Sequence, residues 1–153
     1  MSRRILVPVD GSPTSNRGLA EAIKIAGSQK AKLCLLHVVD NSAVTMAPDM
    51  GGLYTDQLFD LMRESGKKVL AKAAAAARSR GIKATTILVE SITRPVADAI
   101  VAQAKKWRAD LIVLGTHGRR GLSRLVMGSD AEGVVRTADV PVLLVRATGQ
   151  RRR

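Results

Sequence analysis

Residues 5–13 read Ile-Leu-Val-Pro-Val-Asp-Gly-Ser-Pro, an apolar run that ends in a polar turn. A short, continuous apolar run is typical of a strand that is buried on both faces of a parallel sheet. The Asp-Gly-Ser-Pro turn is a helix-start signal, because small polar residues cap helix N-termini and proline is tolerated in the first helical turn. The stretch therefore predicts a buried strand followed directly by a helix.

The same alternation repeats to the end of the chain. Further apolar runs complete a set of predicted strands at residues 5–9, 32–39, 84–89, 110–114 and 141–145. Apolar residues three and four positions apart predict helices that begin near Pro13, Leu58, Thr93 and Ser129. This order predicts an α/β fold, a single doubly wound parallel sheet with helices on both faces. Ligands of such sheets bind beyond the carboxyl ends of the strands.

The length of 153 residues predicts one domain, which we place at residues 1–147, followed by a basic, disordered tail at residues 148–153. The single cysteine, Cys34, excludes an intramolecular disulfide framework. No apolar run approaches the length of a membrane span, and because the first apolar run is short and ends at Asp10 we expect no secretory signal. We therefore expect a cytoplasmic protein with no membrane partner.

The chain is strongly basic, with a formal net charge of +12, and three of the positive charges lie in the tail. Such a charge attracts polyanions and small phosphorylated ligands. Only one Trp, one Tyr and one Phe are present, so the chain has no aromatic platform on which nucleic-acid bases would stack. The composition disfavours sequence-specific nucleic-acid recognition and leaves nonspecific polyanion binding as an alternative.

A glycine-rich basic loop follows the predicted strand 110–114. It contains Gly115 and Gly118, whose missing Cβ atoms let a ligand approach the backbone, and ends with Gly128 and Ser129 at the start of the last helix. Helix N-termini attract anions, and Arg119, Arg120 and Arg124 add positive charge. The loop has the parts of a phosphate cradle. In the alternative reading, Gly115 ends a strand, the arginines are solvated, and Ser129 forms a capping box with Glu132.

The glycines match a spacing known from one family. Gly115, Gly118, Gly128 and Ser129 form the pattern Gly-x2-Gly-x9-Gly-Ser. Together with the segments 5–12, 35–38, 110–118 and 141–145, this pattern resembles the universal stress proteins over nearly the whole domain. The resemblance implies strand order 3-2-1-4-5 and a Rossmann-like fold of the adenine nucleotide alpha-hydrolase type. It also implies ATP, AMP or ADP, with or without Mg, in the crevice between the first and fourth strands.

The resemblance implies a nucleotide-binding set that comprises Pro8, Val9, Asp10, Val38, Gly115, Thr116, His117, Gly118, Arg119, Gly128, Ser129 and Asp130. Pro8, Val9 and Asp10 would line the adenosine side, and the backbone of Val38 would meet adenine. Gly115, Gly118, Gly128 and Ser129 would hold the ribose and phosphates.

Asp10 would serve a ribose hydroxyl or a Mg ion on the phosphates, because a carboxylate repels phosphate directly. An alternative role for Asp10 is to brace the turn before Pro13. Asp130 departs from the family pattern, in which an apolar residue is common at this position.

Other chemistry-bearing residues have simpler interpretations. His37 is expected to be a satisfied core histidine, Cys34 an inert core thiol, and Trp107 a packing residue at a helix end. Met46 and Met50 would belong to a lid over the nucleotide or to a loosely packed loop.

The sequence contains no Walker A, Rossmann glycine or nucleophile-elbow motif, so at most slow ATP hydrolysis is expected. Our hypothesis, which follows the resemblance, is a stress-response regulatory protein that uses the nucleotide as a conformational ligand. The resemblance also implies a homodimer through residues 141–145. The alternatives are a homodimeric interaction module without nucleotide and a basic polyanion-binding protein.

Overall fold

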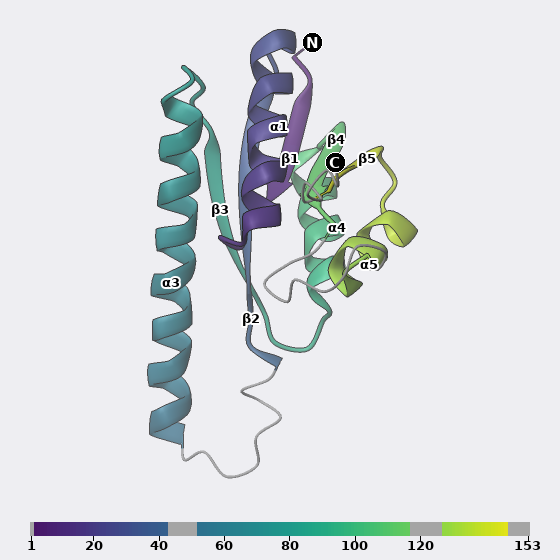
Figure 1. Cartoon of the computed structure of the whole chain (residues 1–153). Helices are drawn as coiled ribbons and strands as arrows, with labels where there is room; N and C mark the ends of the chain where they lie inside the picture. The colour runs from purple at the N-terminus through teal and green to yellow at the C-terminus, as the bar shows by residue number, and fades with distance from the viewer. Residues whose placement is uncertain (1, 43–51, 117–126, 147–153) are drawn as a thin grey trace, which may run out of the picture.

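The computed structural model describes residues 2–42, 52–116 and 127–146. The strands of this part of the chain are β1 (Arg4–Pro8), β2 (Lys32–Asp40), β3 (Thr85–Ser91), β4 (Leu111–Gly115) and β5 (Val142–Val145). The helices are α1 (Pro13–Gln29), α3 (Gly52–Arg78), α4 (Val96–Trp107) and α5 (Ser129–Thr137). Figure 1 shows the strands side by side between the helices.

All five strands form one parallel sheet in the order β3-β2-β1-β4-β5. In the centre, Leu6 of β1 is in register with Cys34 of β2 on one side and with Ile112 of β4 on the other. The strand order reverses its direction between β1 and β4, which makes their carboxyl ends the switch point of the sheet. The predicted fold class and strand order are confirmed.

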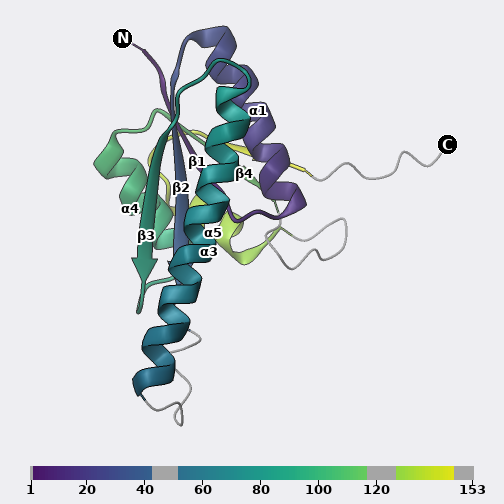
Figure 2. The same ribbon diagram turned by 90° about the vertical axis from the view of Figure 1, so that its left-hand side faces the viewer.

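Helices cover both faces of the sheet, as Figures 1 and 2 show from two directions, and a hydrophobic cluster lies on each face. On one face, Leu19 of α1 and Leu70 of α3 pack over Ile5 and Leu35. On the other face, Ile100 of α4 and Val134 of α5 join a second cluster. Burial on both faces explains why the strands are almost continuously apolar in sequence. None of the helices in the described ranges is long and apolar enough to cross a membrane.

The turn between β1 and α1 is fixed by three small residues. Gly11 adopts a positive φ of 81°, a conformation that costs glycine little. Ser12 is the N-cap of α1, and its hydroxyl accepts a hydrogen bond from the Ser15 N–H at 3.2 Å. Pro13 then occupies the first helical position, where its missing N–H costs nothing. The helix-start signal in the sequence is confirmed.

Helix α3 is the longest element, and its first turns extend past the end of β3 in both ribbon views (Figures 1 and 2). Arg63 ties this helix to β3 through an ion pair with Glu90 and also pairs with Asp60 at 2.7 Å. Gly66 lets α3 approach β2, because a Cβ there would lie 2.6 Å from the ring of His37. The long helix is therefore held against the sheet at two points along its length.

The core residues singled out in the sequence have the expected roles. Cys34 is fully buried in β2, and burial raises the pKa of its thiol to about 11. Trp107 ends α4, where the Arg4 guanidinium lies 4.3 Å from the centre of its ring. The predicted element limits differ from the observed ones by one to three residues at several ends, because helix and strand ends depend on local caps. The start of α3 is a larger miss, since the helix begins at Gly52, six residues before the expected Leu58. Met46, Met50 and the tail at 148–153 lie outside the described residues.

Candidate functional site

The carboxyl ends of β1, β2 and β4 and the N-terminus of α5 converge at one edge of the sheet. The Val9 N–H, just past β1, donates to the Leu36 carbonyl of β2 at 2.8 Å. On the other side, the Thr116 N–H donates to Val145 at 3.0 Å, and the Gly128 N–H donates to the Thr116 carbonyl at 2.6 Å. This last bond fixes the start of α5 beside the end of β4. The hydrogen bonds thus define the walls of a site at the switch point.

Asp10 braces the turn at the end of β1. Its Oδ1 accepts a hydrogen bond from the Ser12 N–H at 2.8 Å, and its own N–H donates to the Ser15 hydroxyl at 3.1 Å. These bonds form an Asx turn that leads into the N-cap of α1. The structural role considered for Asp10 is therefore present, and it holds the carboxylate in a fixed position at the switch point.

Burial and two neighbouring carboxylates affect the pKa of Asp130 at this edge. Loss of hydration raises the pKa of Asp130 most, and the negative charges of Asp40 and Asp10 raise it further. The Asp130 side chain as a whole remains exposed to solvent. In the described part of the chain, no group of three or more His, Cys, Asp or Glu side chains is arranged to hold a metal ion. The edge is thus locally acidic on a chain that is basic overall.

The N-terminus of α5 has no side-chain cap. Gly128 is the N-cap, with φ −59° and ψ 154°, and the helix begins at Ser129. The capping box considered for Ser129 and Glu132 is wrong, because Ser129 lies inside the helix and the Glu132 carboxylate instead pairs with Arg136 at 2.7 Å. A helix start without a side-chain acceptor leaves its first N–H groups oriented for an anion.

Gly115 has a packing role at the end of β4. A Cβ on Gly115 would lie 2.7 Å from both the Thr14 carbonyl oxygen and the Thr14 Cγ2 of α1. A second glycine completes this approach, since a Cβ on Gly18 would lie 3.2 Å from the Gly115 nitrogen. The first glycine of the pattern therefore lets α1 pack against β4, whatever else it does.

The remaining predicted site residues divide into two groups. Pro8 ends β1, and Val38 lies near the end of β2 in register with Val89, so both are at the expected edge. Both side chains are half-buried. His117, Gly118 and Arg119 lie outside the described residues. The described part of the predicted set, from Pro8 to Asp130, is thus brought to one edge of the sheet.

His37 lies beneath this edge as a core residue. It is 9% exposed, and its Nδ1 lies 2.7 Å from the Val9 carbonyl oxygen. Because a carbonyl only accepts, Nδ1 carries the proton and donates it to this bond. The expected role of a satisfied core histidine is confirmed, and the bond also fixes the Val9 backbone at the site.

Sequence reasoning missed two neighbouring residues at the end of β2. Asp40 is one of the charges that raise the pKa of Asp130. Asn41 is 1% exposed; its N–H donates to Ser91 at 2.9 Å, while its Oδ1 has no hydrogen-bond partner among the described residues. The signal was available, because a polar pair directly after a buried strand marks the carboxyl edge of a parallel sheet.

Comparison with known proteins gives a consistent assignment. The profile of the Universal stress protein family matches residues 1–146. Universal stress protein MJ0531 of Methanocaldococcus jannaschii is 37% identical over 144 residues, covering 94% of this chain and 82% of that protein. Universal stress protein YxiE of Bacillus subtilis is 32% identical over 151 residues, covering 95% of this chain and all of that protein (100%).

Solved structures agree in fold. The structure of MJ0577 from Methanocaldococcus jannaschii superposes with a TM-score of 0.83 at 25% identity, over 98% of this chain and 99% of that chain. More distant universal stress proteins have been solved with cAMP, with dAMP and, in the protein from Arabidopsis thaliana, with AMP bound, at TM-scores of 0.69, 0.68 and 0.69. Their identities of 24%, 22% and 15% support a shared fold. The family match, the two relatives and the switch-point geometry agree: this chain belongs to the universal stress protein family.

Proposed function

We propose that the protein binds an adenine nucleotide at the carboxyl ends of β1 and β4, with its phosphates directed at the N-terminus of α5. The observation that carries this proposal is the helix start at Gly128, which has no side-chain cap and is tied to the end of β4 by the 2.6 Å bond to Thr116. Helix N-termini of this kind stabilise phosphate through their dipole and N–H groups. The fold relatives that bind AMP, dAMP and cAMP support the same ligand class.

Each side of the site has a role in this proposal. Pro8, Val9 and the Val38 backbone form the adenosine side, and the Val9 backbone is already fixed by His37. Gly128 and Ser129 hold the phosphates, together with the further predicted residues Gly115, Thr116, His117, Gly118 and Arg119.

Charge at the site predicts a preference between nucleotides. Asp10, Asp40 and Asp130 place negative charge near the proposed phosphates: the pKa of Asp130 is raised mainly by loss of hydration and further by the charges of Asp40 and Asp10. Like charges repel, so an ATP triphosphate needs a neutralising cation more than an AMP monophosphate does. We expect ATP to bind as its Mg complex, with Asp10 facing the ion or a ribose hydroxyl.

The nucleotide would act as a conformational ligand in a stress-response regulatory protein. A ligand shifts a conformational equilibrium only by as much as its affinities for the two states differ. We therefore expect ATP and AMP, or the bound and empty states, to present different surfaces to a partner protein. The sequence contains no motif for efficient turnover, so at most slow ATP hydrolysis is proposed, and a cytoplasmic location stays a prediction.

A homodimer through β5 is part of this proposal. Among the described residues, β5 pairs only with β4, and it lies at the end of the sheet order. Leu143 on β5 is 39% exposed and Val135 on α5 is 45% exposed, which leaves apolar surface beside an unpaired strand edge. Pairing with a second copy would cover both features. Leu143→Arg is expected to give a monomer in light scattering without loss of the thermal transition.

The test of nucleotide binding is calorimetric titration of AMP and of ATP with and without Mg. The decisive variant is Gly128→Asp, because its backbone angles suit any residue, and aspartate is a favourable N-cap that also repels phosphate. We expect this variant to keep or raise its melting temperature and to bind nucleotide at least about tenfold more weakly. Ala102→Glu, on the exposed side of α4, adds the same charge away from the site and is expected to bind normally.

Three results would overturn the proposal. Equal nucleotide affinity of the Gly128→Asp and Ala102→Glu variants would show that the N-terminus of α5 does not contact the nucleotide. Failure of the unmodified chain to bind any adenine nucleotide at millimolar concentration would favour the interaction module without nucleotide. Binding that instead falls steeply with salt and ignores Gly128→Asp would favour the polyanion-binding alternative.

A further inference from the structure

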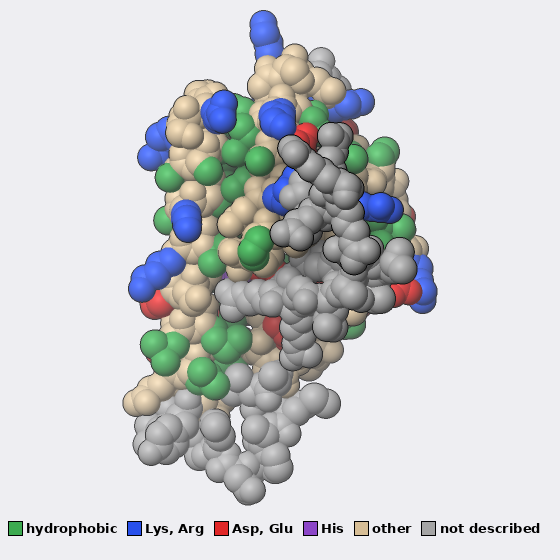
Figure 3. Space-filling model, in the orientation of Figure 1, with side chains coloured by type: hydrophobic (Ala, Val, Ile, Leu, Met, Phe, Trp, Pro, Cys, Tyr) green, Lys and Arg blue, Asp and Glu red, His purple; other side chains and the backbone are tan. Residues whose placement is uncertain are grey.

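A long groove separates the two helices that cover the same face of the sheet. α1 and α3 line a cavity of about 1060 Å³, which is open to solvent along one side. Leu19 and Ile23 of α1 and Val69 and Ala73 of α3 provide its apolar lining. Figure 3 shows hydrophobic side chains between the two helices and Lys and Arg side chains along their outer surfaces. The groove lies along the helices and meets the nucleotide site only at one end, near Asp10.

Each helix contributes a regular stripe to the groove. The lining residues of α1 recur every three or four positions from Pro13 to Gly27, and those of α3 do so from Ser65 to Ala76 and continue to Ser79, directly after the helix. Each stripe combines exposed residues such as Asn16 and Ala76 with buried ones such as Leu19 and Ile23, and fourteen steps of 1.5 Å give it a length of about 21 Å. The groove therefore matches a rod about four helical turns long.

Small side chains keep the groove open. Ala20 and Gly27 of α1 face it from one side, and Ala76, within the alanine block 73–77, faces it from the other. A Cβ on Gly27 would meet its nearest neighbour, Ile82, only at 4.0 Å, so this glycine is not required by packing. Within the alanine block, Ala73 and Ala77 are buried against the sheet, whereas the small side chain of Ala76 leaves this side of the groove unfilled.

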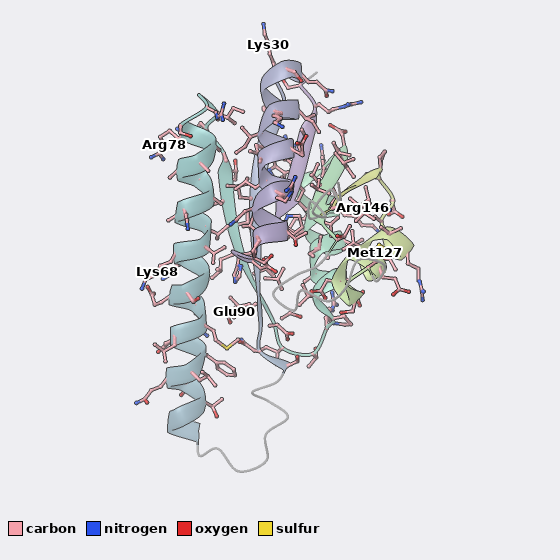
Figure 4. The ribbon with its side chains drawn as sticks, viewed as in Figure 1. Lys30, Lys68, Arg78, Glu90, Met127 and Arg146 are labelled. Atoms are coloured by element: carbon pink, nitrogen blue, oxygen red, sulfur yellow. The ribbon has the colours of Figure 1, made fainter. Side chains whose placement is uncertain are left out.

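Positive charge is spread along this groove. Lys24 lines the α1 side, Lys68 and Lys72 line the α3 side, and Arg80 lies at the far end. Figure 4 shows Lys68 near the middle of α3. Lys24 pairs with Glu21 at 2.9 Å, whereas Lys68, Lys72 and Arg80 form no ion pair with the described residues. An occupant with negative groups at intervals along its length would complement this arrangement.

The chemistry of the groove distinguishes between possible occupants. A nucleic acid strand would supply the charge, but the described lining contains no aromatic side chain for its bases to stack on. An anionic lipid carries its charge in one headgroup, whereas the basic residues here are distributed over several helical turns. An amphipathic helix with acidic residues beside its apolar face satisfies both the apolar floor and the distributed charge.

From this arrangement we infer that the groove between α1 and α3 is a docking site for an acidic amphipathic helix of about four turns, supplied by a partner protein. Its apolar face would lie on Leu19, Ile23 and Val69, and its carboxylates would face Lys24, Lys68 and Lys72. This is the helix-in-groove mode of recognition, in which side chains spaced by three and four residues enter a hydrophobic channel. The inference does not depend on nucleotide binding.

A defined peptide tests the inference. The probe is a fluorescein-labelled 16-residue peptide with leucine on one helical face and glutamate elsewhere, which is about 24 Å long as a helix. Two control peptides carry lysine in place of glutamate, or the same composition rearranged so that no apolar face forms. We expect the acidic amphipathic peptide to bind in the micromolar range, to gain helicity on binding, and to exceed both controls at least about tenfold in affinity.

Matched variants show where the peptide binds. Ala76→Trp fills the groove, whereas Ala71→Trp places the same ring on an exposed position of α3 outside it. Lys68→Glu with Lys72→Glu reverses the charge of the lining, and Lys32→Glu with Lys106→Glu makes the same change in net charge elsewhere. Each groove variant is expected to bind the acidic peptide about tenfold or more weakly than the parent chain does. Each control variant is expected to lose less than about twofold in affinity. Thermal unfolding of each variant shows that it is folded.

Three results would overturn the inference. The first is no binding of the acidic peptide up to about 1 mM. The second is equal weakening by the groove variants and their controls, which would indicate nonspecific attraction to a basic surface. The third is tighter, groove-dependent binding of decanoate or of single-stranded DNA, which would assign the groove to a different class of ligand. Nucleotide titration of the same variants keeps this result separate from the proposed function.

Discussion

Gly115 ends β4 directly against Thr14 of α1, so closely that a Cβ on the glycine would lie 2.7 Å from the Thr14 carbonyl oxygen. Thr14 belongs to the first turn of α1, which follows the Asp10 turn at the end of β1. The contact therefore joins the two sides of the switch point. The proposed nucleotide site is built on a backbone contact that only glycine permits, because backbone atoms cannot move aside as a flexible side chain can.

Gly115→Ala is expected to destabilise the chain by about 1–3 kcal/mol, the usual cost of overpacking a close contact. The measurement is urea unfolding of the variant and of the parent chain. Gly27→Ala is the matched control, since its new methyl group would meet only Ile82 at 4.0 Å. Because alanine favours a helix more than glycine does, this control is expected to gain about 0.5 kcal/mol. Equal stability of the two variants would contradict the packing role of Gly115.

Two serines that resemble helix caps are expected to behave differently. Ser12→Ala removes the hydroxyl that accepts from the Ser15 N–H, and its expected cost is about 1 kcal/mol of unfolding free energy. Ser129→Ala removes no cap, since Gly128 occupies that position, and its expected effect is within about 0.5 kcal/mol. Thermal or urea unfolding of both variants checks this pair. A larger loss of unfolding free energy for Ser129→Ala than for Ser12→Ala would support the capping box of Ser129 and Glu132 and contradict the observed helix start.

The raised pKa of Asp130 predicts a pH dependence of stability. The folded chain binds this proton more tightly than the unfolded chain, so the free energy of unfolding falls as the pH rises from about 4 through the folded pKa. Asp130→Asn replaces the carboxyl group with an amide that does not titrate, so this fall in the free energy of unfolding is removed. At pH 7, the free energy of unfolding of the variant is expected to exceed that of the parent chain by less than about 1 kcal/mol, because the side chain is exposed. Near pH 3, the two free energies are expected to be equal.

Urea unfolding at pH 3, 5 and 7 measures this difference directly. The same substitution removes a negative charge beside the proposed phosphates, so ATP affinity is expected to rise. A variant that is less stable than the parent chain at pH 7 would contradict the electrostatic account of this edge.

Cys34 is expected to resist thiol reagents in the folded chain. Its pKa of about 11 leaves almost no thiolate at neutral pH, and its side chain is fully buried. Ellman's reagent is expected to react roughly a hundredfold or more slowly with the native chain than with the chain in urea. Fast labelling of the native chain would indicate that β2 opens to solvent.

The fold was predictable because its signals are local and repeated. Residues 5–9 and 111–114 are apolar without alternation, as expected of strands in a sheet covered on both faces. Periodicity alone did not order the strands, since neighbours in a parallel sheet are joined by long crossovers. That order came from the resemblance, and the pairing of Leu6 with both Cys34 and Ile112 confirms it.

The site was predictable only in part, because its details depend on contacts between distant segments. The sequence marked Gly115 and Ser129, but not that Gly115 faces Thr14 or that Ser129 lies one residue inside the helix. The convergence of Asp40 with Asp130 brings together segments ninety residues apart. The groove was likewise invisible, since the alanine block showed a helix without showing how far α3 stands from α1.

Titration of AMP into the ¹⁵N-labelled chain, followed by amide chemical shifts, tests the central claim most directly. The account predicts saturable shifts at Val9, Val38 and Ser129, at the ends of β1 and β2 and the start of α5, with little change at Lys106 on α4. Gly128→Asp is expected to abolish these shifts and leave the rest of the spectrum in place. An unchanged spectrum at millimolar AMP, or shifts confined to another surface, would contradict a nucleotide site at the switch point.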